Sequence, residues 1–182
     1  KRGFHLLRKH FYLPIPDEED IPSLHWDNQS AMAGVDMNDA GALEILDRVF
    51  PVHMDEFRGS FPMDRTIDPQ QFYLINGGYM AVDAHVYYAL IRHFKPERII
   101  EIGAGNSTLL AGRACMKNLN ETGRATDLTA IEPYPTEVLS SNPPGLTRLI
   151  EAKVQDVGMD LFTSLKENDI LFIDSSHVLR EG

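Results

Sequence analysis

The chain has 182 residues, enough for one domain of ordinary size and a small accessory segment. Its 43% hydrophobic and 24% charged residues are normal for a globular protein, and no apolar run reaches the roughly 18 residues of a membrane span. The net charge of −10 and the scattering of the 17 basic residues disfavour nucleic acid as a partner, because nucleic-acid binders usually present a basic face.

The cysteine content and the chain ends add two further expectations. Cys115 is the only cysteine, which excludes an intrachain disulfide and a multi-cysteine zinc site. No signal peptide is visible, so we expect a cytoplasmic protein with no membrane partner. The chain begins at Lys1 without a methionine and stops at Gly182 just after an apparent strand. We therefore expect it to be a piece of a longer protein.

Residues 1–75 are predicted to form an N-terminal extension that is partly extended and partly helical. The aromatic and proline-rich residues 11–16 indicate extended chain. The acidic residues 17–20 are more typical of a solvated turn than of a metal site. The spacing of apolar residues predicts a helix over residues 39–50 with Asp39 as its N-cap, which Pro51 then ends.

Residues 76–182 are predicted to form the main domain. A helix over residues 78–94 has one apolar face, made of Val82, Val86, Tyr87, Leu90, Ile91 and Phe94. The chain then alternates between strands and helices. The predicted strands are 98–102, 128–132, 147–154 and 169–174, and the predicted helices between them are 107–118, 135–140 and 159–166. This alternation predicts an α/β fold with a doubly wound, mostly parallel sheet.

A glycine-rich loop follows the first predicted strand. Gly103 and Gly105 allow a sharp turn and the close approach of a ligand, and the next helix presents unpaired N–H groups there. The third glycine of the dinucleotide fingerprint is absent, because Thr108 takes its place. Glu101 precedes the loop inside the strand, where it would repel a pyrophosphate and favour a positively charged ligand.

Three further acids follow the later strands. Glu132 ends the second strand, where its carboxylate could accept hydrogen bonds from ribose hydroxyls; the alternative is a surface acid. Asp156 follows the third strand and could accept from an adenine amino group, or it could cap a helix. Asp174 ends the fourth strand and is expected to face the region of a second substrate.

These motifs together resemble one known family. They are Glu101-Ile-Gly-Ala-Gly-Asn-Ser-Thr108, Glu132, Gln155-Asp156 and Phe172-Ile-Asp-Ser-Ser-His177. The set looks like the class I, Rossmann-like S-adenosylmethionine-dependent methyltransferases, and most like their small-molecule O-methyltransferase branch. The resemblance covers about residues 80 to 180. In that family the sheet has seven strands in the order 3-2-1-4-5-7-6, so this chain would supply the part 3-2-1-4 and lack the later strands.

The resemblance also implies roles for individual residues. The loop residues Gly103, Ala104, Gly105, Ser107 and Thr108 would surround the methionine part of S-adenosylmethionine. Glu101 would lie beneath its amino group, Glu132 would bind the ribose, and Asp156 the adenine. The implied reaction is transfer of a methyl group to a small-molecule acceptor, expected to be a hydroxyl, by in-line displacement, which depends mainly on positioning.

Several alternatives remain open at this stage. His177 could be a general base with Asp174 beside it, or it could pack at the strand end. A divalent metal at Asp174 is an alternative that we do not expect, because hard cations prefer several oxygen ligands. An NAD-dependent oxidoreductase is the second functional hypothesis, and a non-catalytic cofactor-binding fragment is the third. The oligomeric state is left open.

Overall fold

The structure is a computed structural model that describes residue 34 and residues 36–176. Residues Asn38–Asp174 form one compact unit. Its strands are β1 Arg98–Ile102, β2 Asp127–Ile131, β3 Arg148–Ile150 and β4 Ile170–Ile173. Its α-helices are α1 Asp39–Glu44, α2 Phe50–Ser60, α3 Ala81–Phe94, α4 Asn106–Thr122, α5 Glu137–Ser140 and α6 Met159–Thr163. The π-helix η2 spans Ile45–Val49, and the short 3-10 helix η3 spans Val154–Asp156.

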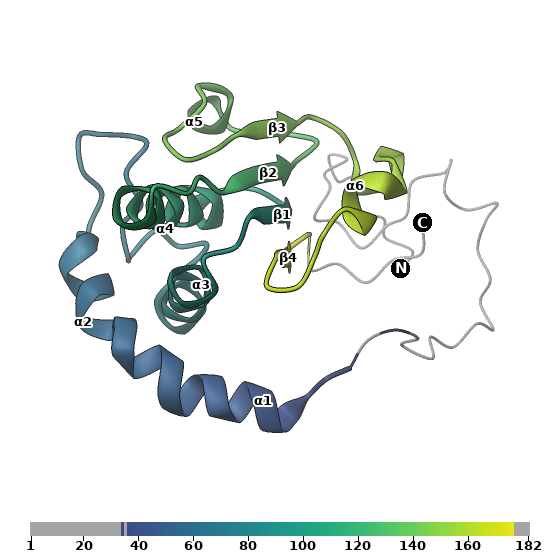
Figure 1. The fold of residues 1–182 in the computed structure, drawn as a ribbon. Helices are drawn as coiled ribbons and strands as arrows, with labels where there is room; N and C mark the ends of the chain where they lie inside the picture. Colours follow the sequence, from purple (N-terminus) through teal and green to yellow (C-terminus); the bar gives the residue numbers. More distant parts are fainter. Residues whose placement is uncertain (1–33, 35, 177–182) are drawn as a thin grey trace, which may run out of the picture. The chain divides into compact units, whose positions relative to one another are not determined.

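The four strands form one parallel sheet in the order β3-β2-β1-β4 (Figure 1). This confirms the predicted α/β, Rossmann-like fold and its strand order. In the register, Glu101 of β1 lies between Ala130 of β2 and Phe172 of β4. Because all strands run in one direction, the loops that follow them meet at a single edge of the sheet.

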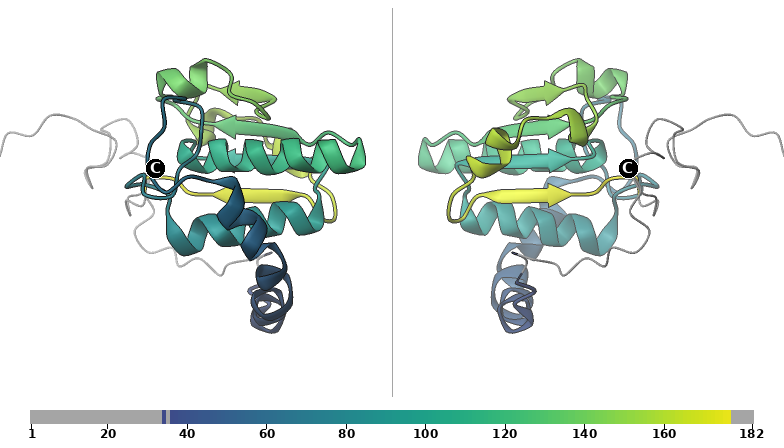
Figure 2. Two further views of the ribbon diagram at one scale, coloured as in Figure 1. Left: turned by 90° about the vertical axis from the view of Figure 1, so that its left-hand side faces the viewer. Right: turned by 90° about the vertical axis from the view of Figure 1, so that its right-hand side faces the viewer.

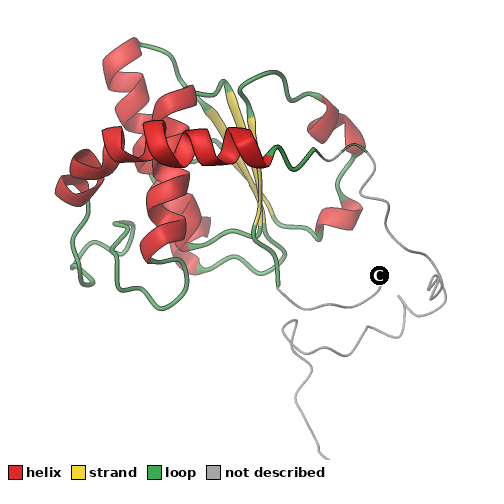
Figure 3. Ribbon diagram, turned by 90° about the horizontal axis from the view of Figure 1, so that it is seen from below, coloured by secondary structure: helices red, strands yellow, loops and turns green. Residues whose placement is uncertain are grey.

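Helices cover both faces of the sheet, but to different extents. The helices α3 and α4 lie on one face, and α6 lies on the other (Figures 1 and 3). Figure 2 shows α4 across the front of the sheet in its left view, and β4 with α6 in its right view. The core lies between the sheet and α2, α3 and α4, and Ile99, Leu110 and Leu128 are fully buried in it. Leu171 and Ile173 of β4 are exposed on the opposite face.

The predicted N-terminal helix differs from the structure in two ways. Asn38, and not Asp39, is the N-cap of α1, and its side-chain oxygen accepts a hydrogen bond from the N–H of Gly41 at 3.2 Å. Pro51 does not end the helix. It lies at the start of α2, where a missing N–H is tolerated, and the π-helical turn η2 carries the chain into α2. Residues 11–20 lie outside the described part of the chain, and the predicted division at residue 75 stays a prediction.

The later elements confirm the predicted order, with shorter bounds in places. The third strand ends at Ile150 instead of residue 154, because the N–H of Ala152 bonds back to the carbonyl of Ile150 and turns the chain. The helix predicted from residue 78 begins at Ala81, and Val82, which was assigned to its apolar face, is 67% exposed. None of the helices in the described part of the chain is long and apolar enough to cross a membrane.

Candidate functional site

The glycine loop, residues 103–105, joins β1 to α4 at the carboxyl edge of the sheet. Gly103 has a φ of 83°, which a glycine adopts without strain. Its N–H donates to the carbonyl of Ile131 at 2.9 Å, and the N–H of Asp174 donates to the carbonyl of Ile102 at the same distance. The loop is therefore fixed between the ends of β2 and β4, where ligands of parallel sheets bind.

A side chain of the first turn of α4 caps the start of this helix. The N–H of Gly105 donates to the Thr108 hydroxyl at 3.1 Å. Ser107 and Thr108 are both buried, at 4% and 1% exposure. These two residues, which the sequence placed at the cofactor, thus shape the loop from behind. Ala104 and Gly105 are half-buried and lie on the more open side.

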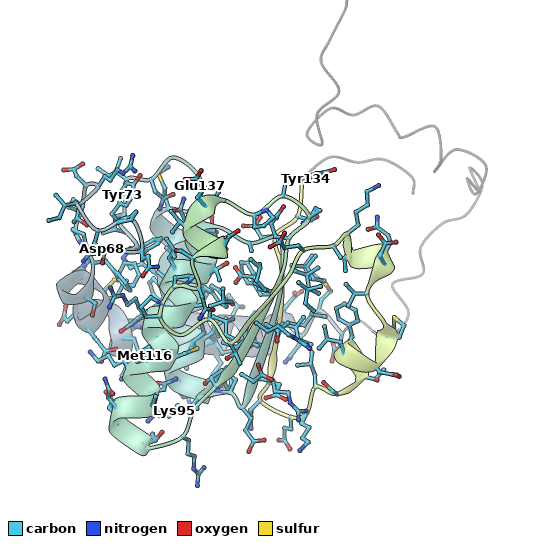
Figure 4. All side chains as sticks on the ribbon, turned by 90° about the horizontal axis from the view of Figure 1, so that it is seen from above. Asp68, Tyr73, Lys95, Met116, Tyr134 and Glu137 are labelled. Carbon is cyan, nitrogen blue, oxygen red and sulfur yellow. The ribbon has the colours of Figure 1, made fainter. Side chains whose placement is uncertain are left out.

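Glu132 follows β2 and lies beside the glycine loop. Its Oε2 atom accepts from the N–H of Ala104 at 3.2 Å, and its Oε1 atom accepts from the N–H of Tyr134 at 2.9 Å. The side chain is half-buried. Each carboxylate oxygen can accept more than one hydrogen bond, so both retain capacity for a ligand hydroxyl. Figure 4 shows Tyr134 at this end of the sheet, with Lys95 at the opposite end.

The other predicted acids are distributed along the same edge. Asp156 ends η3 and is exposed. Asp174 follows β4 and is half-buried, and its charge raises the pKa of Glu101 in addition to the larger effect of burial. His177 lies outside the described residues, so its predicted role as a base stays a prediction.

Glu101 is enclosed on the helix-covered face of the sheet. It has 0% exposure, and within the described residues neither of its carboxylate oxygens completes a hydrogen bond. Burial raises the pKa of Glu101 to about 8, against a smaller lowering by the hydroxyls of Ser107 and Thr108. The carboxyl group is therefore largely protonated at neutral pH unless a positive charge approaches it.

Three aromatic rings pack near this acid. Tyr87 of α3 stacks on Phe172 of β4 with ring centroids 4.1 Å apart, and the Tyr79 ring meets Phe172 edge-on at 5.8 Å. The Tyr87 hydroxyl is buried and has no hydrogen-bond partner among the described residues. Burial, and then the charge of Glu101, raise the pKa of Tyr87. The Glu101 carboxyl group and the Tyr87 hydroxyl are thus both buried behind the glycine loop, near enough for the charge of Glu101 to affect Tyr87.

A loop before α3 lies against the first residue of α4, and the sequence prediction missed it. The Asn76 amide nitrogen donates to the carbonyls of Tyr73 at 2.8 Å and Tyr79 at 2.7 Å. Its Oδ1 atom accepts from the N–H groups of Gly78 at 3.0 Å and Tyr79 at 2.8 Å. The pair Asn76-Gly77 is a turn signal that could have marked this loop, but the segment was assigned partly to the helix.

A cavity of about 240 Å³ lies elsewhere, lined by Ser60, Phe61, Gln71, Tyr88, Arg113 and Lys117. None of these residues belongs to the glycine loop. Both cations of the lining are already paired, Arg113 with Asp68 at 3.8 Å and Lys117 with Glu56 at 3.1 Å. We therefore place the candidate site at the carboxyl edge of the sheet and not in this cavity.

The metal alternative gains no support from the described residues. Among residues 34 and 36–176, no group of three or more His, Cys, Asp or Glu side chains could hold a metal ion. The acids of the site occupy the ends of different strands, as expected for separate contacts along an extended ligand.

Comparisons with known proteins agree with this fold. A family model described as "Methyltransferase domain" matches residues 100–181. A protein of Archaeoglobus fulgidus described as "Uncharacterized protein" is 33% identical over 178 residues, which cover 88% of this chain and 74% of that protein. No solved structure matches the chain.

Proposed function

The chain belongs to the methyltransferase-domain family, and from this premise we propose that it binds S-adenosylmethionine over the glycine loop and donates the methyl group to a small-molecule hydroxyl. The observation that carries the proposal is the buried Glu101 behind the loop. A bound cation favours the ionised form of this carboxyl group, and the resulting carboxylate attracts the cation strongly because the interior has a low dielectric constant. A pyrophosphate, which is anionic, gains nothing from it.

The residues present fit this cofactor along its length. The half-buried Glu132 carboxylate has acceptor capacity for the two ribose hydroxyls beside the loop. The exposed Asp156 stands next along the edge, where it would accept from the adenine amino group. Glu101 is fully enclosed, so it would act on the amino-acid end through its field or through a bridging water and not by direct contact.

When bound, the cofactor supplies an electrophilic methyl group on a sulfonium. The residues at the carboxyl edge of the sheet would hold an acceptor hydroxyl facing that group, so that in-line displacement could follow. Most of the rate gain would come from this positioning. Asp174, half-buried after β4, or His177 beyond it, would take the hydroxyl proton.

The test is calorimetric titration of the chain with S-adenosylhomocysteine and, separately, with NAD. We expect micromolar binding of S-adenosylhomocysteine and no binding of NAD. Glu132→Ala should abolish this binding while the variant stays folded by circular dichroism. Glu137→Ala removes an exposed acid from the neighbouring helix α5 and should bind like the wild type. Binding of NAD, or of neither ligand, would contradict the proposal.

A further inference from the structure

The glycine loop is held from two sides by side chains of other elements. On the β2 side, Glu132 accepts from the N–H of Ala104 at 3.2 Å. On the α3 side, Asn106 is the first residue of α4, and its side-chain Nδ2 atom donates to Oδ1 of Asn76 at 3.1 Å. A ligand over the loop would therefore lie between these two supports.

The loop of residues 73–79 fits closely against the start of α4. A Cβ atom added to Gly78 would lie 3.5 Å from Nδ2 of Asn106, which is ordinary contact distance. Gly77 has a φ of 78°, so this turn depends on a residue that adopts left-handed backbone. Asn76 makes four hydrogen bonds inside the loop of residues 73–79 and accepts one from Asn106. These bonds position the loop of residues 73–79 and the glycine loop as one unit.

The far end of the same loop reaches the enclosed acid. Asn76 fixes both the N–H and the carbonyl of Tyr79, whose hydroxyl donates to the Asp83 carbonyl at 3.0 Å. Burial, and then the charges of Asp83, Glu101 and Asp174, raise the pKa of Tyr79. The Tyr79 ring therefore lies among the acids at the carboxyl ends of β1 and β4.

From these contacts we propose that residues 73–79 form the wall of the cofactor pocket on the α3 side, with Asn76 as a positioning residue. The inference rests on the proposed function. Asn76 acts through Asn106, whose place at the start of α4 sets the direction of the glycine-loop N–H groups. By this arrangement Glu132 defines the ribose end of the pocket, and the 73–79 wall defines the amino-acid end beside Glu101.

The first experiment is calorimetric titration with S-adenosylhomocysteine of Asn76→Ala, Asn106→Ala and the double variant. Asn106→Ala should weaken binding roughly tenfold, as expected for the loss of one positioning hydrogen bond, and Asn76→Ala at least as much, because it also removes four bonds inside the loop. The double variant should bind about as weakly as Asn76→Ala, because that change already removes the contact with Asn106. Asn120→Ala, an exposed asparagine on the same helix, is the matched control and should leave affinity unchanged. Asn106→Ala keeps the internal bonds of the loop, so it serves even where Asn76→Ala unfolds.

The second experiment is hydrogen exchange of the wild type, which reports on the wall without any substitution. Bound S-adenosylhomocysteine should slow amide exchange in peptides that cover residues 73–79 as well as in those that cover the glycine loop. Wild-type binding with unchanged affinity in both single variants, or with no protection of residues 73–79, would overturn this inference alone. Absence of wild-type binding would overturn the proposed function and this inference with it.

Discussion

The carboxylate of Glu132 accepts a hydrogen bond from the N–H of Ala104 at 3.2 Å, so the end of β2 supports the loop that follows β1. The same carboxylate accepts from the N–H of Tyr134 at 2.9 Å. Glu132 therefore has a structural role in the unliganded protein in addition to its proposed contact with ribose. Loss of affinity in a Glu132 variant does not by itself separate these two roles.

A modified ligand separates the structural role of Glu132 from its proposed contact with ribose. The wild type is expected to bind S-adenosylhomocysteine roughly 10- to 100-fold more tightly than its 2′-deoxy analogue, because a charged hydrogen bond to the hydroxyl is lost. Glu132→Gln keeps one acceptor oxygen for the loop and should lose most of this preference. Calorimetry on both proteins and both ligands measures it. An undiminished preference in Glu132→Gln would assign the ribose contact to another residue.

The pH dependence of cofactor binding tests the role of Glu101. Its pKa of about 8 means that the carboxyl group is protonated below that pH, and a cation favours the ionised form. Affinity for S-adenosylmethionine should therefore rise as the pH increases from 6 to 8, by up to about tenfold per pH unit, and level off above 8. Glu101→Gln should lose this contribution.

The comparison between wild type and Glu101→Gln is essential, because an α-amino group on the ligand titrates in the same range. The measured quantity is the ratio of the two dissociation constants at each pH, obtained by titration calorimetry. A ratio that stays constant from pH 6 to pH 9 would show that Glu101 does not ionise when the ligand binds.

The buried guanidinium of Arg92 is expected to be a main source of stability for the packing of α2 on α3 and α4. Arg92 is 4% exposed, and it donates to Glu56 at 2.6 Å, to Glu121 at 2.6 Å and to the Asn118 side chain. Arg92→Met should destabilise the protein by about 2 to 4 kcal/mol, because it leaves the partly buried Glu56 carboxylate without its main partner. Urea denaturation measures this.

Arg48→Met is the matched control for that change. Arg48 pairs with Glu44 at 3.0 Å, but both side chains are well exposed, so its removal should cost less than about 0.5 kcal/mol.

Burial raises the pKa of Glu56, but hydrogen bonds from Arg92, Tyr88 and Lys117 outweigh it and hold the pKa at about 2. The stability contributed by this carboxylate is therefore present above pH 4.5 and is lost as the pH falls toward 2. Equal losses of unfolding free energy in Arg92→Met and Arg48→Met would contradict the prediction that Arg92 is a main source of stability.

Backbone contact between α4 and the turn before β3 predicts a strong effect at Gly112. A Cβ atom added to Gly112 would lie 2.4 Å from the carbonyl oxygen of Pro144, closer than any real contact. Gly112→Ala should therefore cost about 2 to 4 kcal/mol of unfolding free energy, since backbone must move on both sides. In α2, Gly59 has no atom near its added Cβ, and Gly59→Ala should be neutral or stabilising. Thermal and urea denaturation compare the two, and a Gly112→Ala protein of wild-type stability would show that α4 does not press on this turn.

Much of the fold could be predicted because the responsible signals are local. The apolar run of β1, the alternation of strands and helices and the glycines after β1 each act within a few residues, and the structure places β1 at the predicted residues 98–102. The same signals placed Glu101 and Glu132 at the ends of the first two strands. The exact starts of α1 and α3 were not predicted, because the N-cap at Asn38 and the turn held by Asn76 depend on single side chains.

By itself, then, the sequence determined the parallel α/β sheet, the position of the glycine loop and the order of the acids along one edge. Only the tertiary structure decided which side chains touch that loop. It enclosed Glu101 completely, turned Thr108 back onto Gly105, and brought Asn76 to Asn106 across 30 residues of chain. Hydrophobic periodicity depends on neighbours along the chain, whereas burial and pairing of polar groups depend on which segments the fold brings together.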